Sequence, residues 1–177
     1  RDRLTIDPSL IKMGQDIARS LLVERHERSW SMSSHPDHPK SASPWTLQQR
    51  EGEDGRTVSV ISSLAIGKPG AESRTGILRS SPFIAHDTIS FWICGHRGHP
   101  DQPPHENNFI RLTDSKTGKE LRRAYPPRND RAIKVEWELS SLKGRQVELE
   151  VIDGDNGPSF AWLAITRLKP PAAQVDS

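Results

Sequence analysis

Arg131-Ala-Ile-Lys-Val-Glu-Trp-Glu-Leu139 is the stretch that decides the fold class. From Ile133 onward every second residue is apolar, and the residues between them are charged. Side chains of a β-strand point alternately to the two faces of a sheet, so this pattern gives one dry face and one wet face. Residues 146–153 repeat the alternation, with Val, Leu and Val set against Glu. We therefore predict two half-buried strands and expect Trp137, on the dry face of the first, to pack in the core.

Six more short runs with alternating or fully apolar patterns occur nearby, and no helical run separates them. The eight predicted strands are residues 57–66, 76–80, 87–94, 108–114, 119–125, 131–139, 146–153 and 160–168. This texture predicts an all-β domain folded as a two-sheet antiparallel β-sandwich. A jelly-roll order is favoured over an immunoglobulin-like one.

The N-terminal region has a different texture. Asp7 followed by Pro8, and then by apolar residues at helical spacing, is typical of a helix start, so we predict a short N-terminal helical extension to about Glu27. The chain begins at Arg1 instead of Met, which we interpret as the start of a piece of a longer protein.

Residues 31–44 are rich in Ser, Pro and His and show no apolar period, so we interpret them as a linker. His35 and His38 within it are expected to be solvated instead of metal-bound. The predicted organisation is an N-terminal helix and linker at 1–44, a β-sandwich domain at 45–169 and a flexible tail at 170–177.

Length, charge and cysteine content restrict the function. At 177 residues, with 33% hydrophobic and 27% charged residues, the chain has the composition of one globular domain with extensions. Its net charge of +2, without basic runs, argues against a nucleic-acid partner. No stretch reaches the ~20 apolar residues of a membrane span, so membrane insertion is not expected. The single Cys94 lies in an apolar run, which indicates a buried side chain and not a nucleophile.

The longest loops of the predicted sandwich are polar and broken by proline. They are residues 95–107 after the third strand, 126–130 after the fifth and 153–159 after the seventh. Because successive antiparallel strands reverse direction, loops after odd-numbered strands emerge at the same end of the sandwich. Loops carry function more often than strands do, so we expect a binding site at this end.

Seven residues of these loops have side chains that recognise hydroxyl-rich or carboxylate-bearing ligands. Arg offers a planar fork of donors, and Asp and Asn bond to paired hydroxyls. The candidates are His96, Arg97, Arg128, Asn129, Asp130, Asp153 and Asp155. Trp162, close behind the last loop, is expected to line the floor of the site with its indole. The alternative is that these residues only shape the loops, through turns and Arg–Asp ion pairs.

Metal binding is the second chemistry that these loops offer. Asp153, Asp155 and Asn156 resemble part of an oxygen-rich calcium loop, so a structural Ca²⁺ is a candidate cofactor, although none is required. A zinc or copper site in residues 95–107 is the weaker alternative, because a proline-broken loop holds such ligands poorly. Its ligands would be His96, His99, His105, Asp101 and Glu106. No Cys-x-x-Cys-His segment is present, so no haem belongs to this fragment.

Catalysis has little support in the sequence. No nucleophile elbow, zinc-protease helix, phosphate-binding loop or dinucleotide fingerprint is present. Asp101 and Asp153 form a candidate hydrolase carboxylate pair, but two acidic residues on loops are common. We therefore expect a protein that is not an enzyme.

Six ordered segments give the chain a family resemblance. They are Phe91-Trp-Ile-Cys-Gly-His-Arg-Gly98, Asn108-Phe-Ile-Arg-Leu112, Pro126-Pro-Arg-Asn-Asp130, Val135-Glu-Trp-Glu-Leu139, Val151-Ile-Asp-Gly-Asp155 and Ala161-Trp-Leu-Ala164. With these segments, residues 45–168 resemble a galactose-binding-like, carbohydrate-binding-module-like β-sandwich of bacterial multidomain cytochrome-type proteins. The resemblance implies an accessory jelly roll whose loops at one end bind sugars, a structural calcium near the sheet edge, and a periplasmic or cell-surface location.

Two functions follow from these observations, and both stay open at this point. The first is a non-catalytic module that binds carbohydrate through the loop end. Acidic glycans are favoured because arginines outnumber the one nearby lysine, Lys68. These arginines are Arg74, Arg97, Arg128 and Arg131. The second is a structural module whose loop end packs against a neighbouring domain of the parent protein.

Overall fold

The computed structural model describes residues 30–169. Regular structure in that range consists of β-strands and one short 3-10 turn, Ser140–Leu142. The all-β prediction is therefore confirmed for the described chain. The predicted N-terminal helix and the tail at 170–177 lie outside the described residues.

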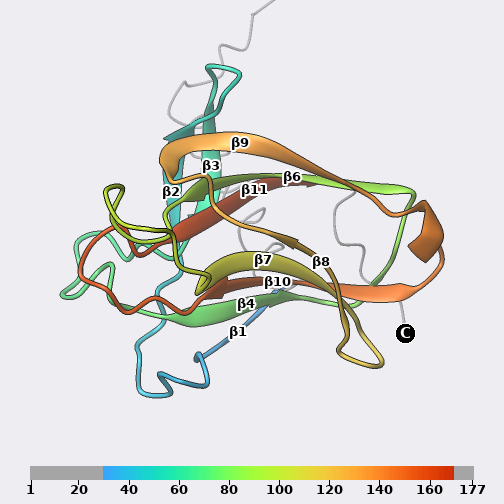
Figure 1. The fold of residues 1–177 in the computed structure, drawn as a ribbon, viewed down its shortest axis with the longest axis horizontal. Helices are drawn as coiled ribbons and strands as arrows, with labels where there is room; N and C mark the ends of the chain where they lie inside the picture. The colour runs from blue at the N-terminus through green and yellow to red at the C-terminus, as the bar shows by residue number, and fades with distance from the viewer. Residues whose placement is uncertain (1–29, 170–177) are drawn as a thin grey trace, which may run out of the picture.

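Two antiparallel sheets face each other (Figure 1). The first has the order β1 (Trp30–Ser33), β4 (Gly76–Ser80), β10 (Gln146–Asp153), β7 (Asn108–Asp114) and β8 (Glu120–Ala124), with β5 (Phe83–Ile84) also beside β10. The second has the order β2 (Thr46–Glu51), β3 (Thr57–Ser62), β11 (Leu163–Lys169), β6 (Thr88–Gly95) and β9 (Asn129–Glu138). This arrangement is the predicted β-sandwich.

The strand order is that of a jelly roll. The eight strands predicted from the sequence correspond to β3, β4 and β6 to β11. Numbered one to eight along the chain, they have the order 1-8-3-6 in one sheet and 2-7-4-5 in the other. Of these eight, only β7 and β8 are both consecutive and neighbours, and every other connection crosses from one sheet to the other. The crossings place the loops at the two ends of the sandwich.

The main core fills the space between the sheets. Trp137 of β9 is 8% exposed and meets the ring of Phe91 edge-on, with the ring centroids 4.9 Å apart. Val147, Leu149 and Val151 face the same core from β10. The alternation in residues 131–139 and 146–153 thus gave the correct inward faces, and the core position of Trp137 is confirmed.

A second apolar cluster lies on the opposite face of the five-stranded sheet. Cys94 of β6 and Ala164 of β11 belong to it, while their chain neighbours on the same strands face the main core. Gly52, just after β2, bridges Ala132 of β9, so the two edge strands of this sheet approach each other. The sheet therefore curls around the second cluster. Burial there raises the pKa of the Cys94 thiol to about 12, which keeps it a thiol and supports its predicted inert role.

Three strands escape prediction from the sequence: β1, β2 and β5. The linker interpretation of residues 31–44 is wrong for Ser31–Ser33, which pair with β4 in the sheet. Further along, the backbone N–H of Thr75 donates to Ser41 Oγ at 2.9 Å, which ties the rest of this segment to the sandwich. The domain thus begins before residue 45. An edge strand has one neighbour and mostly exposed side chains, so β1 carries no apolar alternation to reveal it.

Candidate functional site

The three long loops meet at one end of the sandwich, at the left of Figure 1. The backbone N–H of Gly154 donates to the carbonyl of Asn107 at 3.1 Å. Arg128 Nη2 donates to the carbonyl of Gln102 at 2.8 Å, which connects loop 126–130 to loop 95–107. The prediction from strand alternation is therefore confirmed. We call these three loops, residues 95–107, 126–130 and 153–159, the loop cluster.

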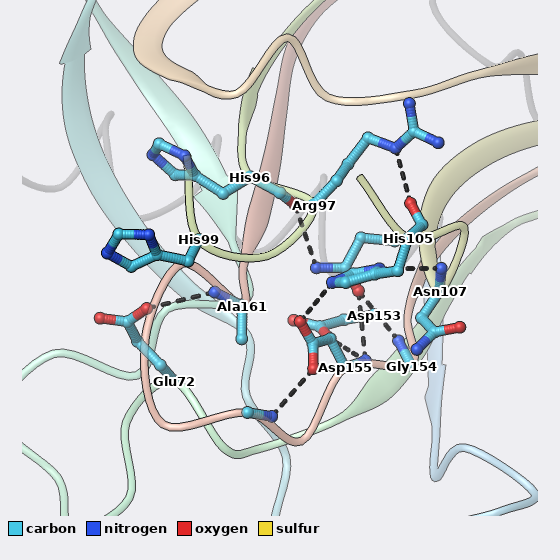
Figure 2. Close-up of polar contacts among 12 residues, drawn as sticks. Glu72, His96, Arg97, His99, His105, Asn107, Asp153, Gly154, Asp155 and Ala161 are labelled. Carbon is cyan, nitrogen blue, oxygen red and sulfur yellow. Dashed lines mark hydrogen bonds and ion pairs between the residues drawn. The ribbon is translucent and has the colours of Figure 1, made fainter. Parts of the chain in front are cut away.

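A fourth loop, residues 63–75, also reaches the loop cluster. It follows the first predicted strand, so the same alternation rule places it at this end. Glu72 Oε2 accepts a hydrogen bond from the backbone N–H of Ala161 at 3.2 Å (Figure 2). The hydroxyl of Ser73 donates to the carbonyl of Gly157 at 3.2 Å. Sequence reasoning did not consider this connection and missed Glu72.

The centre of the loop cluster is an interaction between His105 and Asp155, whose side chains point toward one another in Figure 2. His105 Nε2 lies 2.5 Å from Asp155 Oδ2, and His105 Nδ1 accepts from the N–H of Asn107 at 3.2 Å. An accepting Nδ1 places the ring proton on Nε2, where it is donated to the carboxylate. The other carboxylate oxygen accepts from the N–H of Gly157 at 2.9 Å. Both groups are thus engaged within the protein.

Asp153 is buried beneath this pair. Its exposed fraction is 0%, and burial raises its pKa well above the ordinary value, against the smaller opposing effect of hydrogen bonds from Ser63 and from the Asp155 backbone. One carboxylate oxygen has no hydrogen-bond partner within residues 30–169. Asp101, by contrast, has a side chain that is 86% exposed. Asp153 therefore cannot touch a ligand from solvent in this conformation, and the two carboxyls do not share an open site.

The arginines of the loop cluster bond to backbone carbonyls. Arg97 Nε donates to the carbonyl of His105 at 2.7 Å, and its guanidinium stacks on the ring of Tyr125, 3.9 Å from the centroid. Arg128 Nη2 donates to the carbonyls of His99 and Gln102. Arg128 has a φ of 64°, a left-handed conformation that this clamp holds in place. Across the described residues no ion pair joins Arg97 or Arg128 to a carboxylate, so the alternative of Arg–Asp bridges between loops does not hold for these two.

His96 faces a different direction from the His105–Asp155 pair (Figure 2). Its Nε2 lies 2.8 Å from Asp130 Oδ1, and its ring packs edge-on against Phe160 and Trp162 at centroid distances of 5.0 and 5.6 Å. Nδ1 is buried and has no hydrogen-bond partner in the described part of the chain. His96 is thus a buried residue that positions Asp130, whose side chain is 69% exposed.

Trp162 does not line an open floor. Its exposed fraction is 4%, and the Arg50 guanidinium covers its ring at 4.6 Å from the centroid. The expectation of an accessible indole is wrong because β2, which carries Arg50, was missing from the predicted strands. An aromatic platform for stacking a sugar is therefore absent at this position.

An open groove lies at the edge of the loop cluster, between β2 and the start of β9, and shares Asn129 and Asp130 with it. It has a volume of about 270 Å³. Its lining residues are Gln49, Arg50, Glu51, Asn129, Asp130 and Arg131. Two of these, Asn129 and Asp130, are predicted site residues, and Arg131 belongs to the predicted arginine set. The three from β2 were missed because their strand alternates between half-buried and exposed side chains without an apolar residue on its inward positions. The sequence feature that could have revealed these residues is the polar run Thr46-Leu-Gln-Gln-Arg-Glu51 itself.

The charges in the groove are only partly compensated. Arg131 Nη2 pairs with Glu51 Oε1 at 2.6 Å, and about half of each side chain is exposed. Arg50 Nη2 donates to Gln48 Oε1 at 2.8 Å, and no carboxylate pairs with Arg50 in the residues that the structure describes. The groove therefore offers one paired cation and one cation without an anionic partner.

Metal ligands do not converge at the loop cluster. In residues 30–169 no three His, Cys, Asp or Glu side chains lie close enough to hold an ion together. Both Asp155 oxygens take part in hydrogen bonds within the protein, and Asn156 is exposed. A structural Ca²⁺ at Asp153, Asp155 and Asn156 stays a prediction. Separately, no helix in the described range has the length and apolarity to span a membrane.

Comparison with known proteins gives only distant likenesses. No family model and no curated protein match the sequence. Among solved structures, the K1 cleaved adhesin domain of Lys-gingipain from Porphyromonas gingivalis W83 is similar, with 12% identity, a TM-score of 0.47, and coverage of 79% of this chain and 88% of that one. The C-terminal CBM6 of LamC from Zobellia galactanivorans has 7% identity, a TM-score of 0.38, and coverage of 78% and 99%. A carbohydrate-binding module from Cellvibrio mixtus lichenase 5A, solved with cellotriose, has 10% identity, a TM-score of 0.35, and coverage of 77% and 96%.

These neighbours are an adhesin domain and carbohydrate-binding modules. Because their TM-scores lie below 0.5, the fold assignment rests on this chain's own two sheets, and nothing about a ligand follows from the likeness. The cytochrome-type parent protein stays a prediction.

Proposed function

We propose that the protein is a non-catalytic binding module that takes carbohydrate in the groove between β2 and β9. The observation that carries this proposal is the groove lining: six polar side chains, two of them amides, two carboxylates and two guanidiniums, around one open volume. Amides and carboxylates bond to vicinal sugar hydroxyls, as donors and acceptors respectively. The site is thus at the predicted end of the sandwich but shifted from the loop cluster toward β2.

The groove side chains are held in place by their own neighbours. Asp130 is positioned by His96, and the Asn129 side-chain oxygen accepts from the N–H of Arg131 at 2.9 Å. Groups that are already oriented lose less conformational freedom on binding, which supports recognition of a flexible oligosaccharide.

Acidic glycans are the favoured ligands within this class. Arg50 has no anionic partner in the described chain, and a uronic-acid carboxylate would supply one. Arg131 would also bind the ligand carboxylate once its ion pair with Glu51 breaks. That pair is partly exposed, so it stabilises the fold by only about 0.2–1 kcal/mol. The arginines at 97 and 128 drop out of this role, because their donors hold loop carbonyls.

The second candidate function is a structural module that packs against a neighbouring domain. Two observations favour it: His105, Asp155 and Arg128 of the loop cluster bond to groups within the protein, and Trp162 is not available for stacking. In that case the groove would receive a polar segment of the adjacent domain instead of a sugar.

A glycan array tests the carbohydrate proposal. We expect retention of uronic-acid oligosaccharides by the unmodified protein and a clear loss for Arg131→Gln. Arg145→Gln is the matched control, because its side chain is 52% exposed, as that of Arg131 is, and pairs with Asp114 instead of Glu51. Repeating the array with a chelator tests the calcium prediction. Retention of no glycan, or equal retention by both variants, would favour the interdomain function.

A further inference from the structure

A second hollow lies away from the groove, where β1 and the following segment approach the start of β4. Its volume is about 140 Å³. Its lining residues are Met32, Ser33, Ser34, Ser41, Ser43 and Thr75. Five of the six carry a hydroxyl group and none carries a charge. No residue is shared with the groove between β2 and β9, so the two hollows are separate features.

The hydroxyl of Thr75 is the unusual group in this pocket. Thr75 is 1% exposed, and its Oγ1 has no hydrogen-bond partner in residues 30–169. Leaving a buried hydroxyl unbonded is unfavourable, and such groups are rare in folded proteins. The hydroxyl of Ser41 is already engaged, because it accepts from the Thr75 N–H at 2.9 Å and donates to the carbonyl of Ala42 at 3.3 Å. The donor and the acceptor sites of Thr75 Oγ1 are therefore unused within residues 30–169, and a bound molecule reaches them only when the atoms that cover this hydroxyl shift.

The pocket wall combines hydroxyls with one apolar side. Met32 is 50% exposed, and the Ser43 hydroxyl contacts its sulfur at 4.0 Å. A thioether and its methyl group form a polarisable apolar surface, suited to the C–H face of a ring. Hydroxyls on the other sides both donate and accept, which matches a ligand that carries hydroxyls of its own.

Size and charge narrow the ligand class. The volume is well below the about 300 Å³ at which pockets for drug-sized ligands begin, and well above the roughly 30 Å³ share of one water molecule. The lack of a charged lining residue disfavours an ion. We propose that this pocket binds a single neutral sugar ring or a comparable cyclic polyol, with Thr75 Oγ1 as its central hydrogen-bonding group.

The chain offers a clean probe for this pocket. It contains two methionines, Met13 and Met32, so methyl-¹³C methionine labelling gives two signals, one of them from the pocket wall. The probes are D-glucose, D-galactose, D-mannose and myo-inositol, each titrated separately. We expect at least one of them to shift the Met32 signal saturably while the Met13 signal stays in place.

Three variants distinguish binding in the pocket from binding elsewhere on the protein. Thr75→Val keeps the shape but removes the hydroxyl, so the affinity read from Met32 should fall at least tenfold. The melting temperature should be unchanged or higher, because no hydrogen bond to residues 30–169 is lost. Ser31→Ala changes a neighbouring β1 hydroxyl outside the pocket and should titrate as the unmodified protein does. Arg131→Gln in the groove should also leave the Met32 titration unchanged, so failure of the carbohydrate proposal for the groove would not affect this result.

Three outcomes would overturn the proposal. The first is the absence of a saturable Met32 shift with all four probes. The second is an unchanged titration of Thr75→Val. The third is a marked drop in the melting temperature of Thr75→Val, which would mean that its hydroxyl has a structural partner.

Discussion

The loop cluster and the groove lie at the same end of the sandwich but use their polar side chains in opposite ways. In the loop cluster, His105 and Asp155 bond to each other, and Arg97 and Arg128 donate to loop carbonyls. In the groove, about half of the Arg131–Glu51 pair is exposed, and Arg50 has no carboxylate partner in the described chain. The comparison shows that a high density of polar loop residues indicates the end of the sandwich where these loops gather, and does not indicate which side chains are free. The hydrogen bonds each group has already formed decide whether it is free for a ligand.

The largest expected effect concerns the backbone that joins the loop cluster to β6. Gly95 has a φ of 117°, and a Cβ at this position would lie 2.3 Å from the carbonyl oxygen of Trp162. Gly95→Ala is therefore both conformationally strained and overpacked against backbone, and we expect a loss of at least about 2 kcal/mol in the free energy of unfolding. Gly118→Ala is the control, since its φ is also positive but nothing lies near its Cβ. Urea unfolding measures both, and equal losses would contradict the close approach.

Removing the centre of the loop cluster should come next. Asp155→Ala breaks a charge-assisted hydrogen bond with His105 and the bond to the Gly157 N–H, so we expect about 2 kcal/mol of destabilisation. Asp101→Ala is the control on the same end, because the Asp101 side chain is 86% exposed. It should cost less than about 0.5 kcal/mol. A loss below about 0.5 kcal/mol for Asp155→Ala would show that the loop cluster is not self-supporting.

The buried carboxyl of Asp153 should make stability depend on pH. Its folded pKa lies well above its unfolded value of 3.8, so the stability it contributes is fully present below that value and is lost as pH rises through the folded pKa. Asp153→Asn resembles the protonated form, so the unfolding free energy of this variant minus that of the unmodified protein should increase from about pH 5 to about pH 8. His35, whose pKa burial lowers, contributes the opposite trend, but it is present in both proteins and cancels. A difference that stays constant across this range would mean that Asp153 is ionised in the fold.

The sequence predicts the fold and the location of the loop cluster better than it predicts which side chains are free to bind a ligand. Strand alternation alone places Trp137 in the core and gathers three loops at one end, because both follow from the two-residue period of a strand. The groove was missed because half of it belongs to β2, an edge strand without an apolar face. Because β2 was not predicted, Trp162 was expected to be accessible, whereas Arg50 of β2 lies over its ring.

The smallest expected effect on stability is in the groove. Arg131→Gln removes a half-exposed ion pair with Glu51, which should change the unfolding free energy by less than about 0.5 kcal/mol. Arg145→Gln, just before β10, should do the same. A cost of about 2 kcal/mol for Arg131→Gln alone would place Arg131 among the structural groups, as in the loop cluster, and remove it from the binding site.

Titration calorimetry with a galacturonic-acid trisaccharide tests the central proposal most directly. Between about 0.1 M and about 1 M salt the Debye length falls from ~10 to ~3 Å, so charge-driven binding in the groove should weaken at least about tenfold. Arg131→Gln should bind more weakly at low salt, whereas Glu51→Gln, which frees Arg131, should bind more tightly. A neutral trisaccharide should show little salt dependence. If neither trisaccharide binds, and the two variants behave as the unmodified protein does, the groove is not a carbohydrate site and the interdomain function is the better account of this end of the sandwich.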